Sequence, residues 1–369
     1  MTDEIVIISP ESTPGAGGVG DYTLRLLAHW PPLPNLRLLV PKVRESRTAS
    51  PRYFVAELGA DADTILKRLP SKGGKILVQY SAYGFDRAGY PRDLIHALID
   101  WKSKARGLLV LMFHEIWGFW PIMNKNFIVQ FFHRRSIKRL LDCADVVFTS
   151  TSSQAEHLRA LRSPAQVHVL PVGSNIGHDE DTGPWRKPGW AVLFGLQGAR
   201  IRALKKMQSS LSSLAAAGRI TKIITVGANG DGDDEEGRLL SSFRLAEGFE
   251  QRGPQPEREI SRLLLTASFA ISAQDELSYS KSGTFMAYAA HGLNIITACA
   301  SRSKEEPLCW LITPRELLQS VSETELKLRG ERLRAWQKRT SSWETIAAKF
   351  ADALRLAEIS RVRDQGASR

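Results

Sequence analysis

The amino-acid sequence predicts an α/β protein built from two doubly wound, Rossmann-like domains with a cleft between them. The chain has 369 residues, which suits two domains of about 150 to 200 residues each. Short apolar runs alternate with amphipathic stretches along the first half, a rhythm typical of a parallel sheet covered on both faces. The rhythm begins again after a segment between Gly177 and Gly189 that has two prolines and almost no aliphatic residues, so this segment indicates the linker.

The apolar runs place the individual elements. In the first domain, residues 1–178, we expect strands over 5–8, 36–40, 75–79, 107–113, 146–149 and 167–170. In the second domain, residues 190–334, we expect strands over 191–194, 222–226, 269–272 and 294–297, and helices over 202–216 and 257–267. Apolar residues at helical spacing predict a late helix over 335–356 that packs across the domains, before a polar tail over 357–369. Sheets of this kind bind ligands at the carboxyl ends of their strands.

Composition and charge restrict the class of protein. Hydrophobic residues make up 43% and charged residues 24% of the chain, which excludes a disordered or fibrous protein. The net charge of +11 favours an anionic partner, and the three cysteines lack the spacing of a zinc site or a disulfide framework. The N-terminus does not resemble a signal peptide, and no apolar run reaches the roughly 18 residues of a membrane span. We therefore expect a cytoplasmic protein, either soluble or peripheral on the inner face of the plasma membrane.

A glycine-rich loop follows the first strand. Gly15, Gly17 and Gly20 satisfy the G-x-G-x-x-G pattern just before a helical run, where backbone N–H groups and the helix dipole favour an anion. A nicotinamide site is disfavoured, because the loop over 9–14 is long and the second strand ends without the acid that binds ribose. A turn without any ligand is the other alternative.

The segment 17–23, Gly-Gly-Val-Gly-Asp-Tyr-Thr, resembles the N-terminal loop of family 4-like glycosyltransferases, which have the GT-B fold. The resemblance implies that Gly17, Gly18 and Gly20 contact the donor. Leu111-Met112-Phe113-His114-Glu115 is similar to the strand end at which the family places a histidine beside the donor sugar, and segments 144–150 and 170–175 also match in order. His114 is therefore a candidate catalytic residue, with a structural histidine as the alternative.

In the second half, Val192-Leu193-Phe194-Gly195 followed by Arg200 and Lys205 resembles the family's diphosphate-binding arrangement. Gly195 would allow close approach, and the paired cations would stabilise the charge of a departing nucleoside diphosphate. Solvated surface residues are the alternative for each cation taken alone.

The next segment departs from the family pattern. Family members carry two glutamates with seven residues between them, and alignment on His291-Gly292 puts Tyr279 and Ala287 at those positions. What remains is Lys281-Ser282-Gly283-Thr284 at the start of an apolar helix. The backbone N–H groups of this helix start suit a donor phosphate. The alternative is that the segment is an ordinary N-cap without a ligand. Asp275 and Glu276 would supply carboxylates to the sugar hydroxyls, unless they are only an exposed loop pair.

Two charged segments invite functional interpretations. The stretch 116–141 combines many apolar and aromatic residues with Lys and Arg and contains no acid, so it either lies on an anionic membrane surface or packs into the first domain with a solvated basic side. The acidic run 231–236 lacks the glycine and glutamate positions of an EF-hand, so we expect a solvated loop and no metal site.

The resemblance implies a retaining, metal-independent, hexosyltransferase-type glycosyltransferase that uses a nucleotide-sugar donor and needs no cofactor. We expect a glycan or lipid-linked acceptor of bacterial surface or exopolysaccharide synthesis. The alternatives are a sugar-nucleotide epimerase on the same scaffold, a non-catalytic GT-B or anion-binding module, and a nucleic-acid-binding protein. The sequence lacks zinc-finger and RNP-like patterns, so we expect no nucleic-acid partner.

Overall fold

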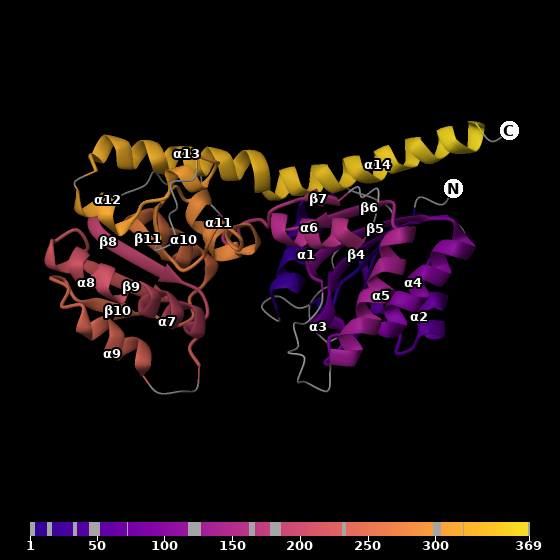
Figure 1. The fold of residues 1–369 in the computed structure, drawn as a ribbon, viewed down its shortest axis with the longest axis horizontal. Coiled ribbons are helices and arrows are strands. Elements are labelled where there is room, and N and C mark those ends of the chain that lie inside the picture. The colour runs from indigo at the N-terminus through magenta and orange to yellow at the C-terminus, as the bar shows by residue number, and fades with distance from the viewer. Residues whose placement is uncertain are drawn as a thin grey trace. The chain divides into compact units, whose positions relative to one another are not determined.

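The computed structural model describes residues 4–12, 17–31, 35–43, 52–71, 73–116, 127–161, 167–177, 186–230, 234–297, 304–319 and 321–367, with the backbone alone for 127–130 and 361–367. The chain divides into two compact units (Figure 1). Unit 1 comprises Met1–Pro171 and Trp343–Arg369, and unit 2 comprises Val172–Ser342. Each unit contains one parallel sheet with helices, which confirms the α/β fold class that the apolar rhythm predicts.

Unit 1 is built on a seven-stranded parallel sheet in the order β3-β2-β1-β4-β5-β6-β7. Its strands are β1 (Ile5–Ile8), β2 (Leu36–Val40), β3 (Phe54–Glu57), β4 (Lys75–Ser81), β5 (Leu108–Glu115), β6 (Val146–Thr149) and β7 (Val167–Val169). The chain winds outward from β1 to β3 and returns to β4 at the centre, which makes the sheet doubly wound. β3 was not expected from the sequence, because this edge strand is only partly buried and has no continuous apolar run.

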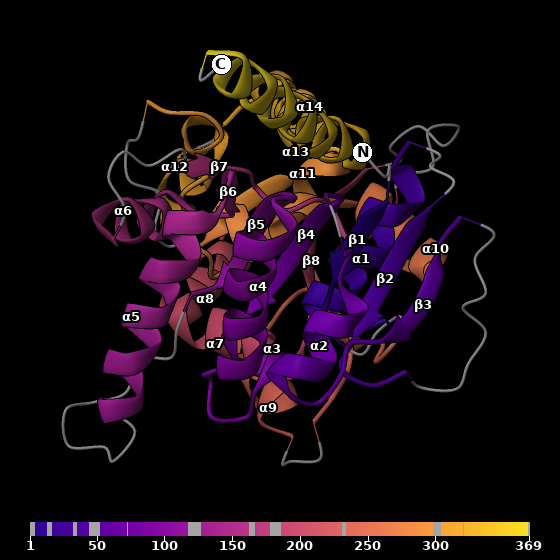
Figure 2. The same cartoon turned by 90° about the vertical axis from the view of Figure 1, so that its right-hand side faces the viewer.

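Helices cover both faces of this sheet. All four residues of β1 are therefore buried, although successive side chains of a strand point to opposite faces. The helices are α1 (Gly18–His29), α2 (Ala62–Arg68), α3 (Ala82–Phe85), α4 (Arg92–Ala105), α5 (Phe127–Cys143), α6 (Ser152–Leu161) and α14 (Trp343–Ala367). α1 and α14 pack together, and α14 also contacts β5 and β6. α2, α4 and α5 form a second layer in which α4 packs against both neighbours (Figure 2).

Unit 2 is built on a five-stranded parallel sheet in the order β10-β9-β8-β11-β12. Its strands are β8 (Lys187–Phe194), β9 (Lys222–Val226), β10 (Phe249–Gln251), β11 (Ala267–Ser272) and β12 (Asn294–Thr297). The helices are α7 (Gln197–Lys206), α8 (Gln208–Ala216), α9 (Glu235–Ser242), α10 (Glu257–Thr266), α11 (Gly283–Ala290), α12 (Pro314–Leu318) and α13 (Glu323–Ser341), with short 3₁₀ turns η1 (Tyr279–Lys281) and η2 (Leu308–Trp310). The helix expected over 202–216 is two helices, α7 and α8, that meet at Met207.

The late helix expected over 335–356 is also two helices. Ser342 is extended, with φ −64° and ψ 155°, and separates α13 from α14. The Trp336 ring lies 6.2 Å from Tyr279 in unit 2, whereas the Phe350 ring lies 4.7 Å from Phe148 in unit 1. Each helix therefore packs on its own unit, and α14 continues to Ala367, through the region where we expected a polar tail.

The boundary between the units falls before the proline-containing segment. The Val172 N–H donates to the Ser280 carbonyl over 2.9 Å, and the Gly177 N–H donates to the Glu257 carboxylate over 2.5 Å. Residues 172–177 therefore belong to unit 2, although the sequence analysis assigns them to the first domain.

Candidate functional site

The end of β8 and the start of α11 meet in unit 2. The Phe194 N–H donates to the Tyr288 hydroxyl of α11 over 2.7 Å, which joins the strand to the helix. Gly195 follows with φ 135°, a backbone conformation that favours glycine. A Cβ placed on Gly195 would lie 3.5 Å from the Thr284 hydroxyl. The structure thus brings Gly195 beside the Ser282–Thr284 segment, two groups that the sequence analysis selected separately.

The start of α11 presents backbone donors. Ser282 is the N-cap, and its hydroxyl accepts from the Phe285 N–H over 3.2 Å. The N–H groups of Gly283 and Thr284 lie in the first turn and have no carbonyl partner within the helix. A Cβ on Gly283 would meet Asn175 at 3.3 Å, so glycine allows the segment after β7 to approach. The arrangement suits an anion and also satisfies the N-cap alternative.

Two exposed lysines add positive charge to this part of unit 2. Lys281 is exposed on η1, directly before the N-cap. Lys206, at the end of α7, donates to the carbonyl of Ala273 just after β11 over 3.4 Å. Lys206 was not expected from the sequence, whereas its neighbour Lys205, the expected phosphate ligand, pairs with Glu235 over 2.6 Å at the surface.

Arg200 is placed differently from the expectation of a free phosphate clamp. It is 2% exposed, and Nε and Nη2 donate to the two carboxylate oxygens of the buried Glu236 over 2.7 and 2.8 Å. Its remaining donors bind the Gly195 carbonyl at 2.5 Å and the Asn229 side chain at 2.7 Å. The ion pair offsets the charge of Arg200, and its donors are occupied. This side chain therefore holds the loops at the strand ends and does not present its own charge to a ligand.

The acidic run 231–236, expected as a solvated loop, is instead engaged where the structure describes it, because Glu235 and Glu236 form the first turn of α9 and Glu236 is buried. Asp234 caps α9 by accepting from the Gly237 N–H over 2.9 Å, Glu235 binds Lys205 and Glu236 binds Arg200; residues 231–233 lie outside the described part. Within the described ranges, no three His, Cys, Asp or Glu side chains are grouped so that they could hold a metal ion.

The loop after β11 contains the two acids proposed as sugar ligands. The Asp275 carboxylate accepts from the Ser278 hydroxyl over 2.6 Å and from the Leu277 N–H over 3.1 Å. The hydrogen bond from Ser278 is the largest cause that lowers the Asp275 pKa. Asp275 therefore forms the turn, whereas Glu276 is exposed beside it.

At the two positions of the family glutamates, the structure places side chains that are not acidic. The Tyr279 ring packs 5.3 Å from Phe285, and Ala287 is completely buried in α11. No nearby acid on α11 takes their place, because the segment from Gly283 to Ala290 contains none.

In unit 1 the glycine-rich loop has a neighbour that the sequence analysis did not consider. A Cβ on Gly17 would collide with the Glu11 carboxylate, and one on Gly20 would lie 2.9 Å from the Glu11 Cβ. Gly18 is exposed and has no such neighbour within 4 Å, whereas Gly15 lies outside the described residues. A carboxylate is favourable at a helix start, but it opposes a donor phosphate at the same place. The structure thus gives Gly17 and Gly20 a packing role.

His114 lies near the end of β5, among polar side chains from three elements. Its Nε2 is 2.8 Å from the Gln79 amide oxygen on β4, and its carbonyl accepts from the Gln154 side chain of α6 over 3.2 Å. The Tyr22 ring of α1 meets the His114 ring edge-on at 4.8 Å, and Tyr22 in turn contacts Trp343 of α14 at 5.1 Å. His114 was expected from the sequence, but none of these partners was.

Burial determines the charge of His114. It lowers the pKa of the imidazole from 6.5 to about 3, because a low-dielectric environment disfavours the charged form. His114 is therefore neutral at physiological pH and contributes hydrogen bonding to this sheet edge.

The basic stretch 116–141 is partly described. Residues 117–126 lie outside the described part, and α5 carries an inner face that includes the buried residues His133, Ile137 and Leu140. Its outer face carries Phe131 and Phe132, 64% and 53% exposed, together with the exposed Arg134, Arg135, Lys138 and Arg139. The structure therefore contains both an inner side that packs in unit 1 and an aromatic, basic outer side.

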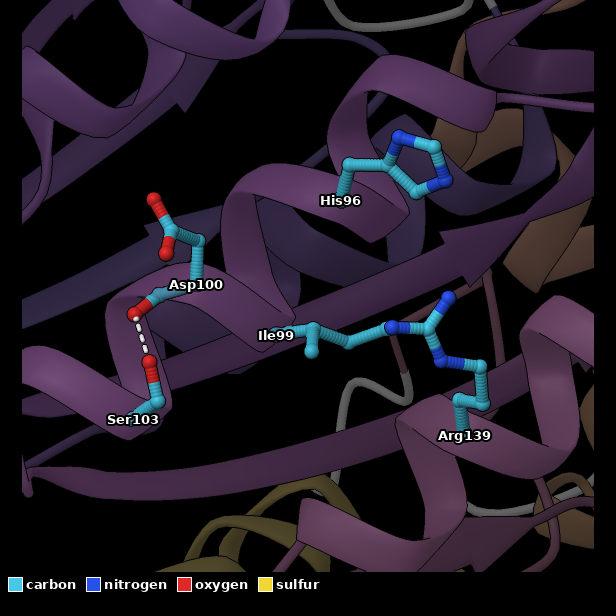
Figure 3. A pocket seen from close by; sticks show the side chains of 5 residues that line it. All are labelled: His96, Ile99, Asp100, Ser103 and Arg139. Carbon is cyan, nitrogen blue, oxygen red and sulfur yellow. Dashed lines mark hydrogen bonds between the residues drawn. The ribbon is translucent and has the colours of Figure 1, made fainter.

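A surface pocket of about 230 Å³ lies between α4 and α5 and is lined by His96, Ile99, Asp100, Ser103 and Arg139. Figure 3 shows Arg139 of α5 extending toward Ile99 of α4. None of the residues selected from the sequence as donor-binding or catalytic lines this pocket. Among the described helices, none is both long and apolar enough to span a membrane.

Known protein structures resemble this arrangement over nearly its whole length. WaaG, a glycosyltransferase involved in lipopolysaccharide biosynthesis, matches 95% of this chain and 99% of its own at 12% identity and a TM-score of 0.59. The E. coli trehalose-6-phosphate protein bound to UDP-2-fluoroglucose matches 95% and 98% at 10% identity and a TM-score of 0.62. An alpha-glucosyltransferase in complex with UDP and DNA matches 95% and 99% at 10% identity and a TM-score of 0.56.

The chain has the GT-B fold. No protein-family model matches the chain, and no curated protein matches it. The GT-B architecture confirms the fold that the 17–23 segment and the order of the later segments implied. At 10–13% identity the likeness establishes the fold, and activity has to be argued from the residues of this chain.

Proposed function

We propose that this protein is a nucleotide-sugar-dependent glycosyltransferase whose donor phosphates bind at the start of α11. The observation that carries the proposal is the approach of Gly195 to Ser282–Thr284, in a GT-B chain with exposed Lys281 directly before the helix. Ligands of doubly wound sheets bind at the carboxyl ends of the strands, and a helix start with free N–H groups is suited to phosphate.

The chemistry requires stabilisation of a leaving group. When the bond between the anomeric carbon and the phosphate oxygen breaks, negative charge grows on the nucleoside diphosphate. The N–H groups of Gly283 and Thr284, together with Lys281 and Lys206, would stabilise that charge without a metal ion. In this proposal transfer retains the anomeric configuration and needs no cofactor, as the family resemblance implies.

Arg200 takes a positioning role in this proposal. It binds the Gly195 carbonyl and Asn229 while Glu236 offsets its charge, so it fixes the two loops that follow β8 and β9. Preorganised donors stabilise a transition state without further reorganisation, and a rigid Gly195 loop beside Thr284 would supply that preorganisation.

The donor proposal is tested by calorimetry with UDP, GDP and ADP. Lys281→Ala and Lys206→Ala should each weaken binding of the preferred diphosphate, because a charge-assisted contact contributes about 1.5–3 kcal/mol. Lys327→Ala, an exposed lysine of α13, is the matched control and should bind as the wild type does. Unchanged affinity in both Lys281→Ala and Lys206→Ala would exclude the proposed phosphate site.

Product analysis distinguishes transfer from the epimerase alternative. A nucleotide sugar incubated without acceptor should remain a single sugar isomer, whereas an epimerase would convert it. Transfer should also persist in EDTA, and loss of transfer on chelation would contradict the metal-independent mechanism.

For the acceptor, we propose a glycan or lipid-linked intermediate of bacterial surface polysaccharide at an anionic membrane. The outer face of α5 supports this, because the exposed Phe131 and Phe132 stand among four exposed cations. Aromatic rings that insert at the headgroup level and Lys or Arg that attract anionic lipid form a peripheral membrane surface. Unit 1 would then stay near the lipid that carries the acceptor.

Liposome co-sedimentation tests this surface. Binding should rise with the fraction of anionic lipid and fall with salt, and Phe131→Ser/Phe132→Ser should reduce it. Phe54→Ser replaces an equally exposed aromatic residue of unit 1, 68% exposed on β3, and should leave binding unchanged. Equal loss of liposome binding in Phe131→Ser/Phe132→Ser and in Phe54→Ser would exclude a membrane role for α5. Equal recovery of the protein on neutral and anionic vesicles would exclude it as well.

A further inference from the structure

The pocket between α4 and α5 contains polar groups that the proposed sugar transfer does not use. Its volume is about 230 Å³, below the roughly 300–1,000 Å³ of most small-molecule sites, so it suits a small group rather than a nucleotide sugar. Four lining residues lie on one face of α4 at helical spacing, and one lies on α5: His96, Ile99, Asp100, Ser103 and Arg139 (Figure 3).

One end of the pocket presents open hydrogen-bond donors. Arg139 and His96 have no hydrogen bond or ion pair with any residue in the described ranges, whereas Lys138, directly before Arg139, pairs with Asp142 over 2.9 Å. The Arg139 guanidinium extends toward Ile99, and His96 lies on the same side of Ile99 in the view of Figure 3. A guanidinium only donates, and an imidazole in either protonation state has at least one N–H. This end therefore suits an anionic oxygen group such as phosphate.

The other end of the pocket is acidic. Asp100 lies on the opposite side of Ile99 from Arg139 in the view of Figure 3. Its Oδ2 accepts from Lys104 at the surface over 2.7 Å, where an ion pair contributes little, and its Oδ1 has no partner within the described part of the chain. A carboxylate and a guanidinium on either side of an apolar residue are complementary to a small zwitterion that carries a phosphate and an ammonium group.

The pocket shares Arg139 with the outer face of α5. Phe132, Arg135 and Arg139 lie at intervals of three and four residues, so they form one stripe along the helix. Phe132 is 53% exposed, and about 10 Å of helix separates it from Arg139 at 1.5 Å per residue. A group that fills the pocket would therefore lie at the same surface from which the aromatic ring projects.

We infer that this pocket binds the phosphoethanolamine headgroup of a membrane lipid, with the phosphate on Arg139 and His96 and the ammonium on Asp100. The inference rests on the membrane surface of α5 in the proposed function and adds a choice among lipids. A basic face alone attracts any anionic lipid. The pocket distinguishes headgroups, because a primary ammonium donates three hydrogen bonds and the trimethylammonium of phosphocholine donates none.

Liposome co-sedimentation of the full-length protein tests the headgroup. Two kinds of vesicle contain the same fraction of phosphatidylglycerol, and the remainder is either phosphatidylethanolamine or phosphatidylcholine, so their surface charge is equal. We expect about tenfold stronger binding to the vesicles with phosphatidylethanolamine, roughly the effect of one hydrogen bond to a charged group. Equal binding of the wild type to the two kinds of vesicle would overturn the inference.

Two pairs of variants with matched charge locate the effect in the pocket. Asp100→Asn should remove the preference for phosphatidylethanolamine, whereas Asp93→Asn, which removes an exposed acid elsewhere on α4, should keep it. Arg139→Gln should also remove the preference, whereas Arg135→Gln should weaken binding to both kinds of vesicle by the same factor. A preference that persists in Asp100→Asn or in Arg139→Gln would assign it to bilayer packing and contradict the pocket.

A soluble headgroup separates the pocket from the membrane surface. If the protein binds neither kind of vesicle, the proposed membrane role of α5 is wrong, and the pocket is then judged by nitrogen-15 NMR of histidine-labelled protein. The His96 signal, assigned with His96→Gln, should shift with glycerophosphoethanolamine and shift less with glycerophosphocholine. An unchanged His96 signal, or equal shifts with the two compounds, would overturn the inference.

Discussion

Arg200 and Glu236 form a buried pair that organises the strand ends of unit 2. They are 36 residues apart in the sequence, and both side chains are at most 1% exposed. The Arg-x-x-x-x-Lys spacing suggested two equivalent phosphate ligands, but burial separates their roles. Arg200 is neutralised and structural, whereas Lys205 remains at the surface.

We expect Glu236→Ala to lower the free energy of unfolding by about 3–5 kcal/mol, because removing one partner leaves a buried, uncompensated charge. Arg200→Met/Glu236→Leu should cost much less than the sum of the two single changes, since no charge then stays buried. Urea unfolding of the wild type, Arg200→Met, Glu236→Leu and the double variant measures the coupling. Additive single effects would mean that the pair is not buried in solution.

A second buried pair joins Tyr80 and His133. The Tyr80 hydroxyl lies 2.7 Å from the His133 Nε2, and burial lowers the His133 pKa from 6.5 to about 4. The unfolded state therefore binds a proton at a higher pH than the folded state does. Stability should rise with pH between these two values and should be lost as the pH falls through them.

Between pH 7 and pH 5, His133 should contribute a loss of about 2 kcal/mol of unfolding free energy. His133→Gln, which can still bond Tyr80, should reduce this pH dependence. Urea unfolding of the wild type and His133→Gln at pH 7 and pH 5 tests this prediction. The pKa of His114 is lowered in the same direction, so His114 accounts for part of the pH dependence that remains in His133→Gln. An equally steep slope in His133→Gln would show that His133 is not buried as a neutral ring.

At the scale of elements, α1 shows why a motif is not yet a site. The glycine pattern predicts a helix start, and α1 does begin at Gly18. The sequence could not show that Glu11 folds back against Gly17 and Gly20, because that contact depends on the path of the intervening loop. The helix was predictable from local pattern, but the occupant of its N-terminus was not.

Gly20→Ala should lower stability by about 1–3 kcal/mol, because its Cβ would meet the Glu11 Cβ and force the loop to shift. Gly18→Ala, with open space around it, should be neutral or stabilising by up to about 1 kcal/mol, since alanine favours helix. Glu11→Gly should relieve the cost of Gly20→Ala. If Gly20→Ala instead weakened nucleotide binding at wild-type stability, these glycines would contact the donor after all.

At the scale of the molecule, α14 returns the chain to unit 1 after unit 2 is complete. Ile346, Phe350 and Leu354 are buried, and the Phe350 ring packs against Trp30 and Phe148 at 6.4 and 4.7 Å. The first unit is therefore assembled from two distant parts of the sequence. Its core is complete only when the last helix has been made.

Phe350→Ala should destabilise unit 1 by about 3–5 kcal/mol, the usual cost of truncating a buried phenylalanine. Hydrogen exchange should accelerate in α1 and β6 and should change little in β9 and β12. Leu356→Ala, at a 57% exposed position of the same helix, should leave both units protected. Equal acceleration in the two units would contradict their division.

The sequence by itself determined the two parallel sheets, most strand positions and the order of the segments, because these depend on local apolar periodicity and on short motifs. It also located His114 and Ser282–Thr284 near strand ends or helix starts. Only the tertiary structure decided that Arg200 faces Glu236, that Glu11 fills the start of α1 and that Gln79 binds His114. These contacts join residues far apart in the chain, or loops without periodicity, and burial sets their charge and hydrogen bonding. The helical pattern of the sequence likewise continues through Ser342, but in the structure this single extended residue ends α13 in unit 2 and precedes α14 in unit 1.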